Sequence, residues 1–217
     1  MAEPEEVIVH EGWAANARLG ILGLDLERIV EVVRIGELAR AQSTAFDPLT
    51  AGGYDAFRYR VRAIREAYCP LGWQVARPFG LELLTSADGS RSLLTRAGTA
   101  GVGIRDADPQ PKGEIGDGTA AAVENAGPLL FNQKWFQVQG LGKPDRETWM
   151  LLVYASRKVV RSELSFGAEL ASGRVGRWFE RIILPELDPN DLTPKRYDLQ
   201  DSDEIAIDVP VIRKKRA

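Results

Sequence analysis

The sequence predicts a single α+β domain, mainly because the character of the chain changes near Trp73. Before Trp73, two segments carry apolar residues at the three- and four-residue spacing of amphipathic helices. After it, short apolar runs are separated by turn-forming residues, which is typical of hairpins. Hydrophobic residues make up 44% of the chain, which is enough to form a core. We expect an N-terminal helical pair packed on a mostly antiparallel sheet of two hairpins, with a C-terminal helix and an extended tail.

The chain divides into an arm, one domain and a tail. Residues 1–12 predict an N-terminal arm or an added edge strand, because they contain one short apolar run, Val7–Val9. Residues 13–187 form the expected α+β domain, whose length is ordinary for a single domain. Residues 188–217 are polar and contain proline, and we expect a charged C-terminal tail there.

Two helices are expected before Trp73. The first covers residues 24–42, where Asp25 is a suitable N-cap. Its charged residues alternate in sign every three positions, which predicts a solvated, self-paired stripe of Arg28, Glu31, Arg34, Glu37 and Arg40. The second helix carries a stripe that we expect to be buried, formed by Tyr54, Phe57, Val61, Ile64 and Tyr68. It should end at Pro70, because proline cannot continue a helix.

Two hairpins are expected after Trp73. The dipeptide Asp88-Gly89 favours a tight turn and separates the strand candidates 81–85 and 92–96. The second hairpin should join residues 148–155 to residues 159–166, whose apolar and polar residues alternate. After it, helical spacing predicts a final helix ending before Pro185, with apolar residues Trp178, Phe179, Ile182 and Ile183.

Histidine and cysteine are nearly absent, which excludes several classes of site. The sequence contains one histidine, His10, and one cysteine, Cys69. A structural zinc site uses four such ligands, and a hydrolytic triad needs a histidine or a lysine beside its nucleophile. The sequence also lacks a P-loop, a nucleophile elbow and a correctly spaced dinucleotide-binding fingerprint. We therefore favour a non-catalytic protein and expect neither a cofactor nor a resident metal.

Residues 98–119 predict a long loop between the hairpins, because they are rich in glycine and lack apolar periodicity. Four carboxylates lie within residues 106–117, namely Asp106, Asp108, Glu114 and Asp117. Oxygen ligands at this spacing suit Mg²⁺ or Ca²⁺, so a divalent-metal-dependent enzyme is an alternative function. An EF-hand is excluded, since Pro111 stands where that loop requires glycine.

A glycine-rich approach to a short helix candidate gives a second alternative, a phosphate-ligand binder. Free N–H groups at a helix start attract anions, and the candidate anion-binding residues are Lys112, Gly118 and Thr119. The neighbouring carboxylates Glu114 and Asp117 oppose this interpretation.

Basic residues gather in two places. Arg58, Arg62 and Arg65 share one face of the second expected helix, and Arg157, Lys158 and Arg161 lie in the second hairpin. Guanidinium groups near aromatic rings suit nucleic-acid binding, which makes RNA or DNA a candidate partner. The competing interpretation is that these cations pair with the chain's own 31 acidic residues, and the net charge of −3 favours it.

The tail has a pattern that suits docking. An acidic cluster at residues 201–204 precedes alternating apolar residues, Ile205, Ile207, Val209 and Val211. An extended strand of this kind can pair with a sheet edge, either on the same chain or on a partner.

These observations favour a binding or assembly component that contacts a protein partner, a nucleic acid or both through its arginine-rich faces and its tail. We expect no membrane partner, because the longest apolar run, 149–155, is far shorter than the roughly 20 residues of a membrane span. The N-terminal stretch lacks the pattern of a secretory signal, and we expect a cytoplasmic protein.

Overall fold

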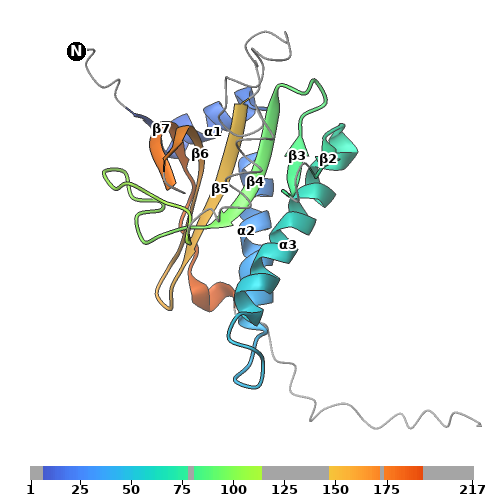
Figure 1. Cartoon of the computed structure of the whole chain (residues 1–217), viewed down its shortest axis with the longest axis vertical. Helices are drawn as coiled ribbons and strands as arrows, with labels where there is room; N and C mark the ends of the chain where they lie inside the picture. The colour runs from blue at the N-terminus through green and yellow to red at the C-terminus, as the bar shows by residue number, and fades with distance from the viewer. Residues whose placement is uncertain (1–6, 78–80, 114–146, 172–173, 193–217) are drawn as a thin grey trace, which may run out of the picture.

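The computed structural model describes residues 7–77, 81–113, 147–171 and 174–192 (Figure 1). In this part of the chain, helices pack on one face of a seven-stranded sheet with the order β1-β7-β6-β5-β4-β3-β2. The strands are β1 (Ile8–His10), β2 (Gln74–Ala76), β3 (Leu83–Thr85), β4 (Arg91–Ala97), β5 (Glu147–Ala155), β6 (Val160–Ala171) and β7 (Arg174–Ile183). The α+β class is therefore confirmed.

The sheet is mixed rather than a simple pair of hairpins. Both predicted hairpins are present, β3–β4 around Gly89 and β5–β6 around residues 156–159. They meet through a parallel pairing of β4 with β5. The edge strand β1 also runs parallel, beside β7, which corresponds to the edge-strand alternative for the N-terminal arm.

Three α-helices precede the hairpins in the described residues: α1 (Gly12–Ile21), α2 (Leu26–Ala41) and α3 (Ala51–Tyr68). The N-cap prediction for α2 is confirmed, because the Asp25 side chain accepts a hydrogen bond from the Arg28 N–H at 2.9 Å. Helix α3 passes at Tyr68 into a short 3₁₀ turn, η1 (Cys69–Leu71), which contains Pro70. Helix α1 was not predicted, since only Ala15 and Leu19 are buried on it and its apolar stripe is weak.

The predicted final helix is wrong, because residues 174–183 form strand β7. This strand lies between β1 and β6, and its buried residues Trp178, Glu180, Arg181 and Ile182 are divided between the two faces of the sheet. Trp178 packs on one side of the sheet and Ile182 on the other. Irregularities in the β6–β7 register further break the two-residue alternation. A strand buried on both faces produces an apolar run that periodicity cannot distinguish from a buried helix.

The core lies between the helices and the sheet. Along β5, Trp149, Leu151 and Val153 face the helices, whereas Met150 and Leu152 belong to a second cluster on the opposite face. After β7, the chain pairs Leu187 with Val160 and forms a short 3₁₀ turn, η4 (Pro189–Leu192), in contact with α2. No helix in the described residues is long and apolar enough to cross a membrane.

Candidate functional site

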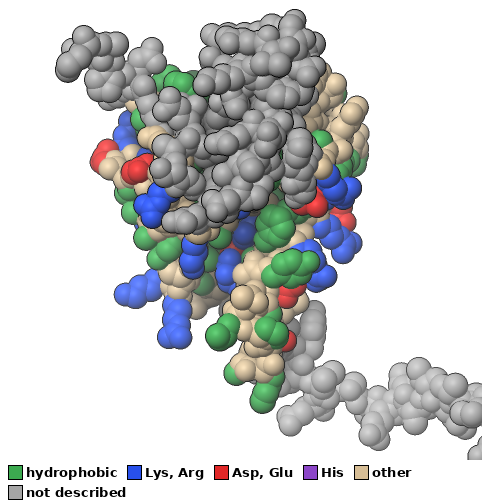
Figure 2. Space-filling model, in the orientation of Figure 1, with side chains coloured by type: hydrophobic (Ala, Val, Ile, Leu, Met, Phe, Trp, Pro, Cys, Tyr) green, Lys and Arg blue, Asp and Glu red, His purple; other side chains and the backbone are tan. Residues whose placement is uncertain are grey.

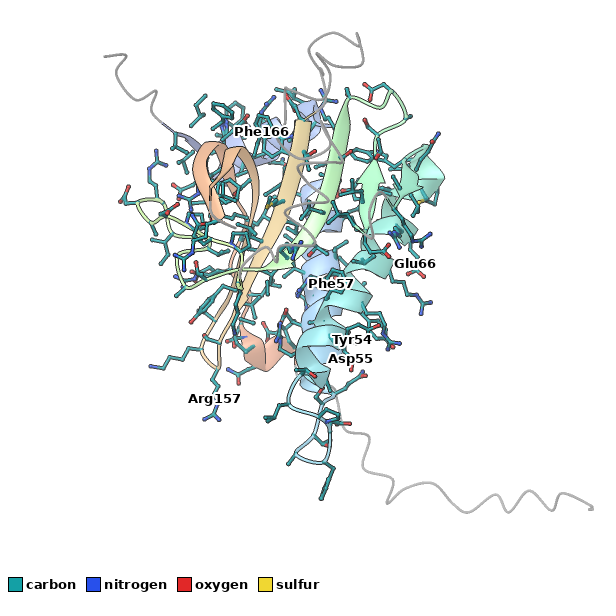
Figure 3. The ribbon with its side chains drawn as sticks, in the orientation of Figure 1. Tyr54, Asp55, Phe57, Glu66, Arg157 and Phe166 are labelled. Carbon is teal, nitrogen blue, oxygen red and sulfur yellow. The ribbon has the colours of Figure 1, made fainter. Side chains whose placement is uncertain are left out.

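A groove along α3 brings three predicted site residues together. Its volume is about 380 Å³, and its lining consists of Tyr54, Phe57, Arg58, Val61, Arg62, Arg65, Glu66 and Glu82. Figure 3 shows Tyr54 and Phe57 on the first half of α3, with Glu66 further along the same helix. The predicted cluster of Arg58, Arg62 and Arg65 therefore shares one concave surface with two aromatic side chains.

The groove exists because the N-terminal half of α3 does not bury its apolar stripe. Val61, Ile64 and Tyr68 are buried as predicted, but Tyr54 is 63% exposed, and this part of the prediction is wrong. The first turns of α3 instead bury Ala56 and Arg60, and the helix packs closely against α2. The aromatic residues at the start of the stripe are left to line a surface groove.

Arg60 is buried between α2, α3 and the sheet. Its Nη1 donates to Glu37 at 2.7 Å, and its Nε donates to the Thr95 hydroxyl at 3.2 Å. Burial lowers the pKa of Arg60 to about 10, although Glu37 acts in the opposite direction. The expectation that Glu37 lies on a solvated stripe is therefore wrong. Its pairing with Arg40 at 2.6 Å agrees with the i, i+3 spacing.

The groove arginines are paired with acidic side chains. Arg58 lies 3.4 Å from Asp55, and Arg62 lies 2.8 Å from Glu66. Arg65 donates a hydrogen bond to Glu82, and this bond is the main cause that lowers the pKa of Glu82. Arg58 also lies over the ring of Tyr59, with 4.7 Å between the guanidinium carbon and the ring centroid.

The second predicted basic cluster is divided by the fold. Arg157, labelled in Figure 3, and the next residue, Lys158, are exposed at the β5–β6 turn. Neither forms an ion pair with another described residue. Arg161 lies over the Tyr154 ring at 5.1 Å and donates to the Ala100 carbonyl at 2.7 Å. Arg161 therefore attaches the Gly98–Gly113 loop to the sheet, whereas the turn presents two cations to solvent.

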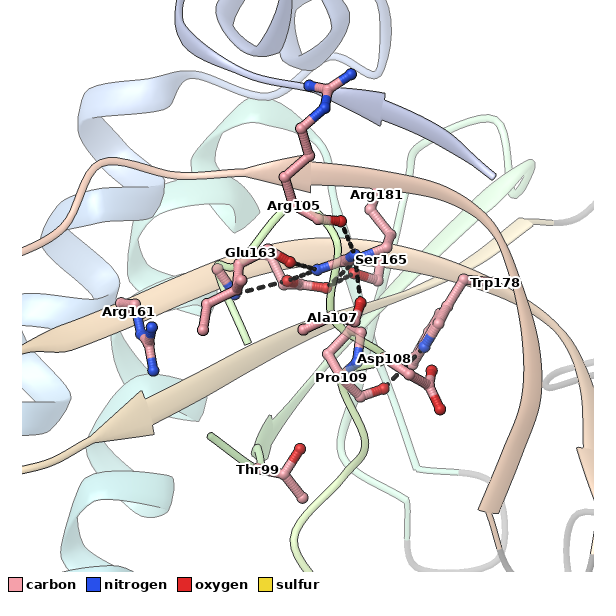
Figure 4. Close-up of polar contacts among 12 residues, drawn as sticks. Thr99, Arg105, Ala107, Asp108, Pro109, Arg161, Glu163, Ser165, Trp178 and Arg181 are labelled. Carbon is pink, nitrogen blue, oxygen red and sulfur yellow. Dashed lines mark hydrogen bonds and ion pairs between the residues drawn. The ribbon is translucent and has the colours of Figure 1, made fainter. Parts of the chain in front are cut away.

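The Gly98–Gly113 loop is held to the sheet by a buried ion pair (Figure 4). Arg181 donates to both carboxylate oxygens of Glu163, at 3.0 and 2.7 Å. It also donates to three loop carbonyls, those of Ile104, Arg105 and Ala107. Glu163 in turn accepts the Gly103 N–H at 2.7 Å, so this part of the predicted loop has a fixed shape.

The structure brings no metal-binding group of carboxylates together among the residues that it describes. The Asp108 carboxylate accepts hydrogen bonds from the Gln110 side chain. Lys112 is exposed near the end of the described part of the loop. The remaining residues of these two alternatives, Glu114, Asp117, Gly118 and Thr119, lie outside the described residues, as do the tail residues Ile205, Ile207, Val209 and Val211.

Sequence reasoning missed both buried ion pairs, Glu37–Arg60 and Glu163–Arg181. The only local signal was Gly36, where a β-carbon would lie 2.3 Å from the Arg60 side chain, but glycine alone does not reveal which residue approaches it. Comparison with known proteins adds no relative, because no family model, curated protein or solved structure matches this chain.

Proposed function

We propose that this chain is a non-catalytic binding protein that contacts a protein partner through the groove along α3. The observation that supports this most directly is the gathering of three arginines with Tyr54, Phe57 and Val61 in one groove. Tyrosine, phenylalanine and arginine are enriched at protein–protein contacts. Tyrosine and arginine are also frequent among the residues whose truncation weakens binding most.

Exposed apolar side chains continue beyond the groove. Phe46 and Leu49, in the connection between α2 and α3, are fully exposed. Figure 2 shows hydrophobic side chains, in green, running from this connection onto the lower half of α3. Neighbouring exposed apolar side chains of this kind mark interaction surfaces, because burying them against a partner removes apolar area from water.

The charge of the groove favours a protein over a nucleic acid. The three groove arginines and Arg77, which also pairs with Glu82, form ion pairs with three carboxylates, those of Asp55, Glu66 and Glu82. Four positive charges against three negative charges leave an excess of one positive charge. Binding to a phosphate backbone depends on several cations that are free to neutralise phosphates. Exposed pairs such as Arg62–Glu66 contribute little stability, so these arginines can exchange their partners for carboxylates of a bound protein.

The test is a native pull-down from the source cells with three forms of the full chain. These are the wild type, the groove variant Tyr54→Ala/Phe57→Ala and the control Trp13→Ala, which truncates an aromatic side chain that is 83% exposed on α1. We expect a stoichiometric protein that the wild type and the control retain and the groove variant loses. Loss of two anchoring side chains should weaken binding by roughly 100-fold.

The same experiment can contradict the proposal in three ways. A protein that all three forms retain does not bind through the groove. A chain recovered without any partner removes the evidence for a binding role. Nucleic acid in the eluate that disappears in Arg58→Ala/Arg62→Ala/Arg65→Ala would assign the groove to RNA or DNA instead.

A further inference from the structure

A second pocket lies at the end of the sheet where the described chain ends. It has a volume of about 470 Å³ and is formed by the end of α2, the β5–β6 turn and η4. In Figure 1, η4 (orange-red) lies beside the lower end of α2. Its apolar lining comes from Ala41, Ala155, Val160, Pro189 and Leu192. It shares no residue with the groove along α3.

The rim of this pocket is basic. Arg40 and Arg157 line it, and Lys158 follows Arg157 on the same exposed turn. The acidic lining residue, Glu37, is already bound by Arg40 and Arg60. On the η4 side, Asp188 accepts hydrogen bonds from Asn190, and Asp191 is exposed. The turn therefore offers two cations that pair with no described carboxylate.

The chain that follows the pocket carries complementary chemistry. Leu192 lines the pocket, so residues 193–217 begin at its rim. The acidic cluster, with Asp201, Asp203 and Glu204, starts nine residues later, and nine extended residues span roughly 30 Å. The aliphatic residues Ile205 and Ile207 follow the acidic cluster directly. A tethered segment of this length is present at a high effective concentration.

The backbone also fixes the starting point of this segment. Val160 donates its N–H to the Leu187 carbonyl at 3.0 Å, and Leu187 donates back at 2.9 Å. Leu192 is buried in the core between the helices and the sheet. The chain therefore leaves the described fold at the pocket and not at a distant edge of the sheet.

We propose that residues 201–207 of this chain dock in this pocket. The carboxylates of the acidic cluster pair with Arg157 and Lys158, and Ile205 and Ile207 pack against Ala155, Val160 and Leu192. Opposite charges at the rim select the segment, and burial of aliphatic surface against the apolar lining stabilises it.

The test is disulfide trapping in the full chain with Cys69→Ser as the background. Ser156, in the pocket lining, and Ser202, in the acidic cluster, are each replaced by cysteine. When oxidised glutathione is added as the oxidant, we expect rapid formation of an intramolecular disulfide, with reduced glutathione released, seen as a monomer of altered mobility on a non-reducing gel. A control pair, Ala87→Cys with Ser202→Cys, uses an exposed position in the β3–β4 turn and should form little disulfide.

Charge reversal distinguishes docking from random contact of a tethered segment, provided that each trapping rate is divided by the rate at which the same cysteines react with a small disulfide, because charges beside a thiol alter its reactivity. Arg157→Glu/Lys158→Glu alters two exposed side chains, and we expect the rate of trapping to fall by about fivefold, because attraction becomes repulsion. Adding Asp201→Lys/Asp203→Lys/Glu204→Lys restores complementary charges and should restore the rate. The control Arg62→Glu, on the exposed face of α3, should leave it unchanged.

Three results would overturn the proposal. The trapping rate could be the same before and after charge reversal, or equal for the Ala87 and Ser156 pairs. Disulfide-linked dimers alone would assign the pocket to a second copy of the chain. Because the pocket and the α3 groove are separate, each of these results leaves the proposed function of the groove standing.

Discussion

At the scale of single residues, Gly36, Glu37 and Arg60 show how a charge is accommodated in this core. Arg60 is fully buried and fits only because Gly36 has no β-carbon. Glu37 accepts hydrogen bonds from Arg60 and from Arg40, whereas Arg60 depends on Glu37 and Thr95. One guanidinium nitrogen of Arg60 has no hydrogen-bond partner among the described residues, so this charge is only partly compensated.

This asymmetry predicts unequal effects of removing the two partners. Glu37→Leu should lower the free energy of unfolding by about 3 kcal/mol, because it leaves a buried charge without its counterion. Arg60→Met should cost less, because Arg40 still donates to Glu37. The double variant Glu37→Leu/Arg60→Met should be more stable than Glu37→Leu alone, since no buried charge remains. Urea denaturation of the wild type, the two single variants and the double variant gives the free energy of unfolding of each protein. If the loss in the double variant equalled the sum of the two single losses, Glu37 and Arg60 would not be energetically coupled.

At the scale of elements, the Gly98–Gly113 loop takes its shape from strand side chains. Arg181 and Glu163 come from β7 and β6, and together they bind the loop at the Ile104, Arg105 and Ala107 carbonyls and at the Gly103 N–H. Trp178 adds a hydrogen bond from its ring N–H to the Pro109 carbonyl at 2.8 Å. The loop also has internal hydrogen bonds, such as that from the Thr99 N–H to the Gln110 carbonyl at 2.8 Å, so its shape depends on the sheet as well as on its own sequence.

We predict that Arg181→Ala releases this loop. Loss of the guanidinium leaves the Glu163 carboxylate buried without its cation and removes the donors to three loop carbonyls. Hydrogen exchange at the Gly103 amide should accelerate by at least about tenfold, because the opening free energy falls. The control Lys158→Ala, on the exposed β5–β6 turn, should leave this amide unchanged. Equal protection in Arg181→Ala would show that the loop is held by other contacts.

Elements with local signals could be predicted from the sequence, and elements defined by distant partners could not. The Asp88-Gly89 turn and the Asp25 cap depend on neighbouring residues, and both are present. The spacing of Arg58, Arg62 and Arg65 likewise places them on one face of a helix, and the groove contains all three. Strand β7 was misassigned because the elements that cover its two faces, α1 and the loop at residues 98–113, lie far from it in the sequence.

At the scale of the whole molecule, the helices and both hairpins share one core. Leu19 from α1, Ile29 from α2, Ile64 from α3 and Leu164 from β6 belong to the same buried cluster. The parallel β4–β5 pairing joins the hairpins into one sheet, and no local signal in the sequence specifies that pairing. The surface groove could not be recognised from sequence either, since the exposure of Tyr54 depends on how α3 packs against α2.

This shared core predicts that the α+β domain unfolds in a single cooperative transition. Far-ultraviolet circular dichroism follows the helices, and tryptophan fluorescence includes the signal of Trp149, which is fully buried at the centre of the sheet. The two urea curves should coincide. Leu164→Ala, which removes a fully buried side chain from β6, should lower both midpoints equally, by about 3 kcal/mol in the free energy of unfolding. The control Leu71→Ala, at a position that is 55% exposed in η1, should change neither. If the helical signal kept its midpoint while the fluorescence shifted, the helices would form a separate cooperative unit, and the α3 groove could then persist without an intact sheet.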